Sequence, residues 1–300
     1  MSTNNFIKLI PLLMEHKESI GDIKSRQGLH TNAGSFVTNY LWRKAMSTKI
    51  YIESDMYSIK EEYDPANIWV FPIGECEAKK KFITELIYTH PDLIFLKVRD
   101  TDKHFLEEHF PDVFHICECP DDDEYIYDVV EYETLKGKKW RKFREAENRL
   151  KARHTVVVEP IDADNIHEVK SIMKSWAEGR SPGGYQNTIG DEIDDEIIKS
   201  YVPLGLIGVI LKVDNRPVAT AIGYPLSDDI CDVAVMKYVK GPKDICRITL
   251  RAFMLHFKDK FRYFNFEEDG GIEGLRTIKK RLNPCRIEKM WKAKLKTQRR

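Results

Sequence analysis

The order of apolar segments in the second half of the chain restricts its fold more than any other feature. A β-branched run over 155–160 precedes an amphipathic segment over 166–176 whose apolar residues recur at helical spacing. An acidic helix is expected near 191–200. Two further apolar runs, 205–213 and 218–226, are separated by Asp-Asn-Arg-Pro, which is typical of a turn between antiparallel strands. This half therefore opens with a strand, helices and a β-hairpin.

The remainder of this half continues the alternation of strands and helices. A strand over 230–239 leads to a helix that Asp244 can cap. A strand at 263–266, a helix at 271–282 and a final strand at 286–295 complete the order. Such an order predicts an α/β domain with a mixed sheet.

The first half carries a weaker version of the same order, without any residue-level repeat. Its expected elements are a strand at 6–10, helical segments within 20–46, strands within 50–59 and at 68–73, a helix at 78–89, a strand at 93–98, a helix at 102–110 and a strand at 113–119. Because a domain commonly has about 150 residues, a chain of 300 residues predicts two domains in tandem.

Charge is balanced overall but segregated along the chain. Lys and Arg together number 48, and so do Asp and Glu. Between Lys136 and Arg153, however, nine Lys or Arg residues accompany only two Glu, and eleven accompany one Glu within 276–300. The first of these segments has an apolar stripe made of Trp140, Phe143, Ala146 and Leu150. It is therefore predicted to be a basic amphipathic helix, as a local anion-binding surface would require in a neutral protein.

Several functional classes lack their signatures in this sequence. The apolar runs are too short for a membrane span and the N-terminus does not read as a signal peptide, so a cytoplasmic protein is expected. Only Cys117 and Cys119 are close together among six cysteines, and neither a disulfide nor a metal site is assigned. No P-loop, dinucleotide or serine-hydrolase motif occurs. Nothing in the sequence sets the oligomeric state.

Three blocks of sequence resemble a known family, and the third comprises SF at 35–36, WR at 42–43 and FPIG at 71–74. The first consists of YIY at 125–127 and LKGKKWRK at 135–142. The second is FNFEEDGGIEGLR at 264–276, which is followed by Lys279 and by Asn-Pro at 283–284. Together they resemble uncharacterised bacterial proteins related to the C-terminal domain of phosphatidylglycerol lysyltransferase, over nearly the whole chain.

The resemblance implies two tandem GNAT-like acyltransferase domains. The expected parts are an inactive N-terminal domain at 1–134, a basic bridging helix at 135–154 and an active C-terminal domain at 155–300. The resemblance also implies aminoacyl transfer that depends on aminoacyl-tRNA. We predict that the acceptor is an amine or hydroxyl group, as of a small-molecule amine, an amino acid or a peptide. The alternatives are an acyl-CoA-dependent N-acyltransferase, and a non-enzymatic module that binds a small anion or a partner protein between its domains.

Three carboxylates follow the predicted strand at 263–266. In a GNAT-like sheet Glu267, Glu268 and Asp269 would lie where strands splay apart, so that one of them can take a proton from an attacking amine or hold the amine of an aminoacyl group. We predict these three residues to be catalytic. The alternative is that one of them only caps the next helix.

Two groups of cations are predicted to bind anions of the substrate. Arg276 and Lys279 lie three residues apart on one helix and share a face that can meet a phosphate or a carboxylate. The basic segment can follow the phosphate backbone of tRNA without reading its sequence. Its predicted contacts are Lys138, Lys139, Arg141, Lys142 and Arg144. Both groups can instead be ordinary solvated surfaces.

An acyl-CoA donor would need a turn whose backbone N–H groups hold its pyrophosphate. The corresponding turn has Lys240, Gly241 and Lys243 as predicted phosphate contacts, but Pro242 removes one N–H donor. No cofactor is therefore assigned, and acetyl-CoA or another acyl-CoA is kept as the alternative donor.

Overall fold

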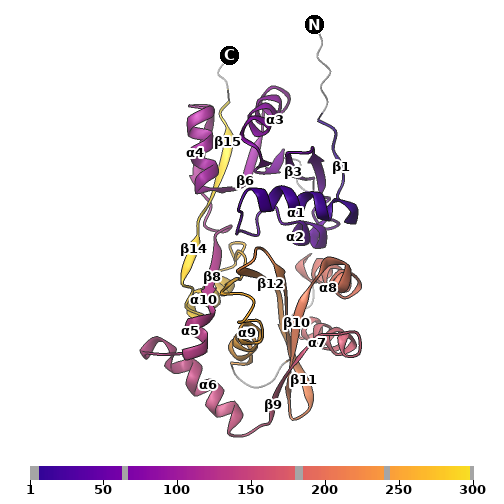
Figure 1. The fold of residues 1–300 in the computed structure, drawn as a ribbon, viewed down its shortest axis with the longest axis vertical. Helices are drawn as coiled ribbons and strands as arrows, with labels where there is room; N and C mark the ends of the chain where they lie inside the picture. Colours follow the sequence, from indigo (N-terminus) through magenta and orange to yellow (C-terminus); the bar gives the residue numbers. More distant parts are fainter. Residues whose placement is uncertain (1–6, 63–66, 180–184, 240–243, 298–300) are drawn as a thin grey trace. The chain divides into compact units, whose positions relative to one another are not determined.

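The structure is a computed structural model that describes residues 7–62, 67–179, 185–239 and 244–297. The chain divides into two compact units, and within the described residues each is built on its own mixed sheet (Figure 1). Unit 1 comprises residues up to Glu124 together with 268–273 and the chain from Ile287 onward, and unit 2 comprises 125–267 and 274–286. Two tandem α/β units, as predicted from element order, are confirmed.

In the described part of unit 1 the sheet has eight strands. They are β1 (Ile10–Pro11), β2 (Lys49–Ile52), β3 (Met56–Glu61), β4 (Ile68–Val70), β5 (Ile73–Gly74), β6 (Ile94–Arg99), β7 (Phe114–Glu118) and β15 (Met290–Leu295). Their order is β1-β2-β3-β4-β6-β15-β7, and β5 pairs with β3. The helices of this unit are α1 (Lys17–Arg26), α2 (Phe36–Trp42), α3 (Cys76–Thr89) and α4 (Asp100–His109), preceded by a short 3-10 turn, η1 (Met14–His16).

The strand β15 differs from the sequence prediction of a single final strand at 286–295 in the second half. The structure divides this segment into β14 (Arg286–Glu288), in the sheet of unit 2, and β15, which lies antiparallel between β6 and β7 in unit 1. Ala293 of β15 is fully buried in the core of unit 1. The partners of this strand are distant in sequence, so its local pattern could not identify them.

Within the described residues, the sheet of unit 2 has seven strands in the order β14-β8-β13-β12-β11-β10-β9. Besides β14 they are β8 (Glu124–Asp128), β9 (Val156–Pro160), β10 (Ile207–Val213), β11 (Arg216–Pro225), β12 (Ile230–Tyr238) and β13 (Tyr263–Asn265). The helices are α5 (Val129–Thr134), α6 (Arg141–Lys151), α7 (Ile166–Glu178), α8 (Tyr185–Leu204), α9 (Ile245–His256) and α10 (Glu273–Arg281), with a 3-10 turn, η2 (Lys138–Trp140), before α6.

Local sequence explains several of these elements. The predicted hairpin is confirmed as β10 and β11, and Asp214 and Asn215 of its turn both have positive φ, as a type I′ turn requires. The acidic helix predicted near 191–200 is longer than expected, because α8 begins at Tyr185. Unit 2 begins at Tyr125 and not near 135, because β8 hydrogen-bonds to β13.

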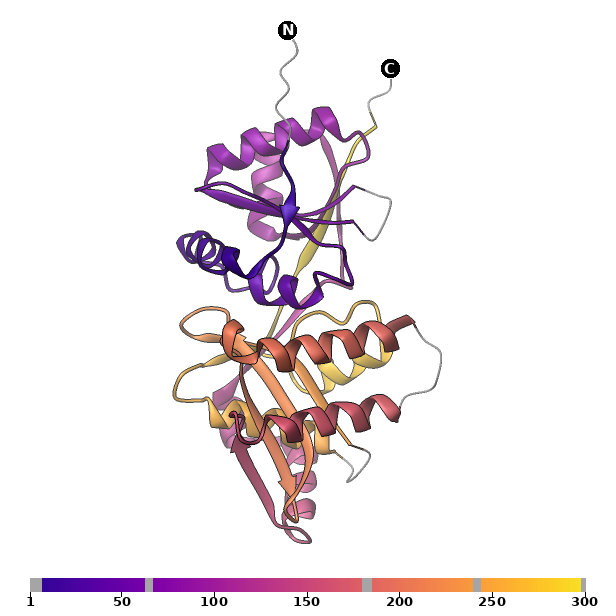
Figure 2. The same ribbon diagram turned by 90° about the vertical axis from the view of Figure 1, so that its right-hand side faces the viewer.

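Helices lie on both faces of the unit 2 sheet, and Figure 2 shows α7 and α8 in front of its strands. On β10, Leu211 packs with Ile245 of α9, whereas the next residue, Lys212, pairs with Glu168 of α7 at 3.0 Å. Successive side chains of a strand point to opposite faces, so α9 and α7 lie on opposite faces of the sheet. Leu150 of α6 belongs to the same apolar cluster as Ile245, so α6 lies on the same face of the sheet as α9. No helix in the described ranges is long and apolar enough to cross a membrane.

Strands β12 and β13 separate after a short contact. Their parallel pairing joins residues 230–232 to residues 263–265. Beyond this contact β12 continues beside β11 as far as Tyr238. The turn that carries the three predicted catalytic carboxylates follows directly after β13, where the two strands diverge.

Candidate functional site

The backbone of Glu267, the first carboxylate of this turn, is fixed by several hydrogen bonds. Glu267 is half-buried and has a φ of 53°, a strained conformation for a residue with a Cβ atom. Its carbonyl oxygen accepts the N–H of Tyr125 at 3.4 Å and the ammonium of Lys279 at 3.2 Å. The side-chain oxygen of Asn265 accepts the N–H of Glu267 at 2.8 Å. Neighbouring segments therefore set the backbone position of this residue.

Lys279, predicted to bind an anion together with Arg276, lies beneath the same turn. Its residue is only 5% exposed, and its ammonium donates to the carbonyl oxygens of Phe266 and Glu267. Arg276, three residues earlier on α10, is half-buried. The two cations therefore differ in depth, and their joint role in anion binding stays a prediction.

Glu268 belongs to unit 1, where it contacts a lysine. The ammonium of Lys97 lies 2.6 Å from Glu268 Oε1 and 3.7 Å from Asp122 Oδ1. Burial lowers the pKa of Lys97, but these carboxylates outweigh burial and raise the pKa above its usual value. Lys97 is therefore protonated at neutral pH beside Glu268. It has a φ of 56°, and no motif in the sequence marked it.

Asp269 holds the backbone of the turn in unit 1. This residue is 1% exposed, and its Oδ1 accepts the N–H of Gly271 at 3.0 Å. The N–H of Gly270 donates to the carbonyl oxygen of Asp121 at 3.0 Å. Gly271 has a φ of 74°, and a Cβ atom there would lie 2.9 Å from the Asp121 carboxylate, so the turn favours glycine.

Two further carboxylates of unit 1 escaped the sequence prediction. Burial raises the pKa of Glu61 on β3, Lys97 opposes this shift, and Asp122 adds to it. Glu124 is fully buried, and its carboxylate accepts the N–H groups of Asn32 and Ala33 at 3.0 to 3.2 Å. The acidic run at 121–124 is visible in the sequence, but its partners come from distant segments. In the part of the chain that the structure covers, no His, Cys, Asp or Glu cluster has the arrangement of a metal site.

The basic segment forms η2 and α6, and it lies wholly within unit 2 instead of bridging two domains. Its apolar stripe is confirmed, since Trp140, Phe143, Ala146 and Leu150 are all buried. The exposed cations are Lys138, Lys139, Arg141, Lys142, Arg149 and Lys151. The apolar side therefore packs on the core, and the basic side faces solvent.

Arg144 differs from the other cations predicted to bind RNA. It is half-buried, and its guanidinium donates to the carbonyl oxygens of Leu135 and Gly137, the latter at 3.0 Å. Leu135 has a left-handed backbone, with a φ of 45°. Arg144 therefore stabilises the turn before η2.

The exposed cations also differ in their partners. Lys139 pairs with Glu131 at 2.5 Å, and Arg141 lies 3.6 Å from Glu145. Lys142 makes no hydrogen bond or ion pair to any residue that the structure describes. Within the described ranges, its ammonium therefore has no carboxylate partner, in contrast to the side chains of Lys139 and Arg141.

The turn predicted to hold acyl-CoA follows β12. Lys240, Gly241 and Lys243 fall within 240–243, outside the described residues. Asp244 comes next with a φ of 70°, and its carboxylate accepts both Arg149 and Arg247, at 3.2 and 3.0 Å.

A family model described as phosphatidylglycerol lysyltransferase, C-terminal, matches residues 26–294. The chain belongs to this family. The match confirms the resemblance seen in the three sequence blocks, and membership supports an aminoacyltransferase. A comparison with curated proteins finds no match.

Solved structures show the same fold at low sequence identity. A conserved protein of unknown function from Bacteroides thetaiotaomicron VPI-5482 has a TM-score of 0.87 at 24% identity, over 97% of this chain and 100% of the other. L-PGS from Bacillus licheniformis has a TM-score of 0.65 at 16% identity, over 94% and 92%. A tandem GNAT protein from the clavulanic acid biosynthesis pathway has a TM-score of 0.50 at 9% identity, over 96% and 98%. The fold is therefore that of two tandem GNAT-like domains.

Proposed function

We propose that this protein transfers an aminoacyl group from aminoacyl-tRNA to the amine or hydroxyl group of a small molecule, an amino acid or a peptide. Family membership supports aminoacyl transfer. The observation that carries the RNA donor is the exposed basic side of η2 and α6, since rows of Lys and Arg bind a phosphate backbone without reading its sequence. This surface belongs to unit 2, which supports activity in the C-terminal half and an inactive N-terminal half.

The chemistry needs a group that accepts one proton. The acceptor nitrogen or oxygen attacks the ester carbonyl that joins the amino acid to the ribose of tRNA. A C–N or C–O bond forms, the ester C–O bond breaks, and a proton passes from the acceptor to the ribose oxygen. A carboxylate near the acceptor can carry this proton.

Glu267 is the candidate for this role among the three predicted catalytic residues. Glu268 contacts Lys97, and Asp269 bonds to the backbone of its own turn. Glu267 follows β13 at a strained backbone position, and such strain concentrates at functional sites. Glu268 and Asp269 would then shape the turn.

A single-turnover assay with tRNAs charged with radiolabelled amino acids tests the proposal. We expect the wild type to move label from tRNA to one member of a panel of amines, amino acids and dipeptides. Glu267→Gln should slow this transfer about 100-fold or more, because general base catalysis contributes at least that much. Glu273→Gln, an exposed change on α10, is the matched control and should leave the rate unchanged.

Two results would contradict the proposal. Transfer from acetyl-CoA, with none from any charged tRNA, would identify an acyl-CoA-dependent N-acyltransferase. No transfer from either donor would favour a binding module.

A further inference from the structure

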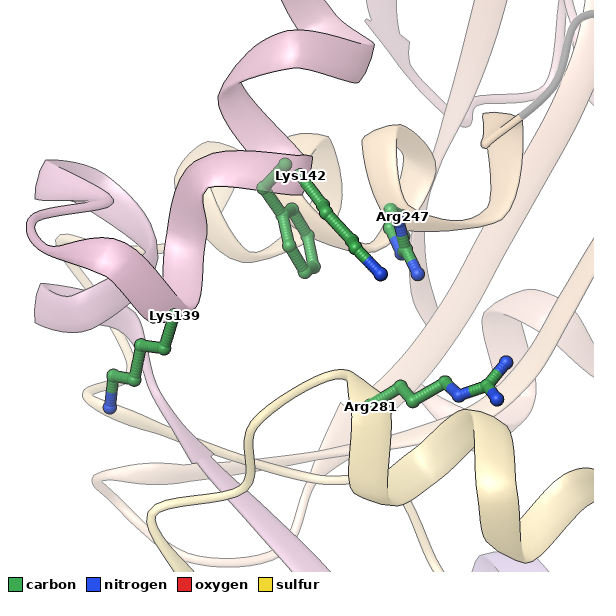
Figure 3. A pocket seen from close by; sticks show the side chains of 5 residues that line it. Lys139, Lys142, Arg247 and Arg281 are labelled. Carbon is green, nitrogen blue, oxygen red and sulfur yellow. The ribbon is translucent and has the colours of Figure 1, made fainter.

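A pocket of about 230 Å³ lies in unit 2 between the start of α6, the start of α9 and the end of α10 (Figure 3). It is lined by Lys139, Lys142, Phe143, Arg247 and Arg281. Figure 3 shows Lys142 and Arg247 extending side by side, with Arg281 reaching across below them, while Lys139 points away. Four of the five lining side chains are cationic, and three of them gather around one space.

Cations outnumber carboxylates at this pocket. Asp244 accepts Arg247 at 3.0 Å, but it also accepts Arg149 at 3.2 Å. Lys142 and Arg281 make neither a hydrogen bond nor an ion pair to the residues that the structure describes. Since like charges repel at short range, this arrangement favours the arrival of an anion.

We propose that this pocket binds one phosphate group of the tRNA backbone, an inference that rests on the proposed function. Planar guanidinium groups match phosphate oxygens with two parallel N–H donors, and Arg247 and Arg281 supply two such groups. Pockets that enclose a whole small molecule measure about 300 to 1,000 Å³. A volume of about 230 Å³ therefore suits a phosphate and its adjoining sugar, with the rest of the ligand outside.

The surroundings of the pocket favour a nucleic acid over a lipid surface. Lys138 and Arg141 extend the basic surface beyond the pocket. The 11 residues of α6 span roughly 16 Å, which matches several phosphates along one strand. A helix that binds membranes needs a free apolar face, whereas Phe143 and Leu150 of α6 are buried in the core.

Filter binding of deacylated total tRNA over a range of NaCl concentrations tests the site. The pocket variant is Lys142→Gln combined with Arg281→Gln, because both side chains are exposed and Arg247 keeps its bond to Asp244. We expect its Kd for tRNA to rise about 10-fold at low salt, as the loss of a charge-assisted contact implies. The slope of log K against log salt should fall by about one phosphate contact.

A matched control removes the same charge from the other face of the sheet. Lys170→Gln combined with Lys174→Gln alters two exposed lysines of α7. This variant should keep its Kd within about 2-fold of the wild type and leave the salt slope unchanged, because screening weakens distant charges. Circular dichroism and the melting temperature establish that both variants are folded.

The outcomes separate the site from the proposed function. A wild type that does not bind tRNA at low salt overturns both. If the wild type binds and the pocket variant behaves like the α7 control, the site is wrong and the RNA donor stands. If the pocket variant keeps its affinity for tRNA but loses stabilisation by acetyl-CoA, or loses co-sedimentation with phosphatidylglycerol vesicles, the pocket serves that ligand and its assignment to RNA is overturned.

Discussion

Each unit gathers charged side chains, but the balance of charge differs. In unit 1 the side chain of Lys97 is 16% exposed and contacts the carboxylates of Glu268 and Asp122. In unit 2, Lys142 and Arg281 line a pocket together with Arg247, whose carboxylate partner Asp244 also accepts Arg149. Removing one partner of a buried charge pair destabilises the fold, whereas surplus exposed charge is available to a ligand.

Lys97→Met should show the largest effect, because it removes the cation from the buried cluster of unit 1. Breaking a buried pair leaves a carboxylate without compensation, which lowers the free energy of unfolding by about 3 kcal/mol. Urea unfolding at pH 7 measures this loss. Lys81→Met, an exposed change on α3, should cost less than about 0.5 kcal/mol. Equal stability of the two variants would refute the structural role of Lys97.

Arg144→Gln separates structural from ligand-binding cations within α6. Losing the guanidinium contacts to the carbonyl oxygens of Leu135 and Gly137 should lower the free energy of unfolding by about 2 kcal/mol. Its Kd for tRNA should stay within about 2-fold of the wild type. Lys142→Gln should show the opposite pattern, with unchanged stability and weaker binding. Weaker binding by Arg144→Gln without a loss of stability would contradict this division.

Asp244→Asn increases the surplus of positive charge at the pocket. Removing one carboxylate beside Arg247 should lower the Kd for tRNA about 3-fold, as one screened charge near 4 Å implies. Asn tolerates the left-handed backbone at this position, so the start of α9 should keep its shape. Asp164→Asn, at an exposed position before α7, is the control. Filter binding with no difference between the two would argue against the pocket.

Glu61→Gln should produce the smallest effect, and that effect depends on pH. Burial raises the pKa of Glu61, so the stability that its protonated form contributes is lost as the pH rises through the folded-state pKa. Gln mimics the protonated acid. The melting temperature of Glu61→Gln should therefore exceed that of the wild type slightly at pH 7, and the difference should vanish below about pH 4. A difference in melting temperature that grows at low pH would contradict a raised pKa of Glu61 in the folded protein.

The parts of the fold that the sequence predicts depend on interactions between residues that are close in sequence. The turn at Asp214 and Asn215 and the apolar stripe of α6 follow from local chemistry and periodicity. The placement of β15 does not, because its neighbours β6 and β7 are distant in sequence and its local pattern does not identify them. The helical segments predicted within 20–46 are α1 and α2, and Gly28 and Gly34 between them both have positive φ.

The candidate sites were predictable in part. The run of carboxylates at 267–269 and the basic segment stand out by residue type. Lys279, however, is buried against backbone carbonyls, and Arg247 and Arg281, which line the pocket, were not predicted as site residues. The sequence around an isolated Lys or Arg does not show which residues it will contact in the folded protein.

The sequence alone determined the tandem α/β architecture, the family and the segments that carry charge. Tertiary structure decided which charges are neutralised, because Coulomb energy depends on distance and burial between segments far apart in the chain. Lys97 meets Glu268 and Asp122 only in the folded unit 1, and Lys142 comes beside Arg247 only when α6 packs on α9. The sequence determines which residues are charged, and the packing determines which of these charges are paired within the fold and which can bind a ligand.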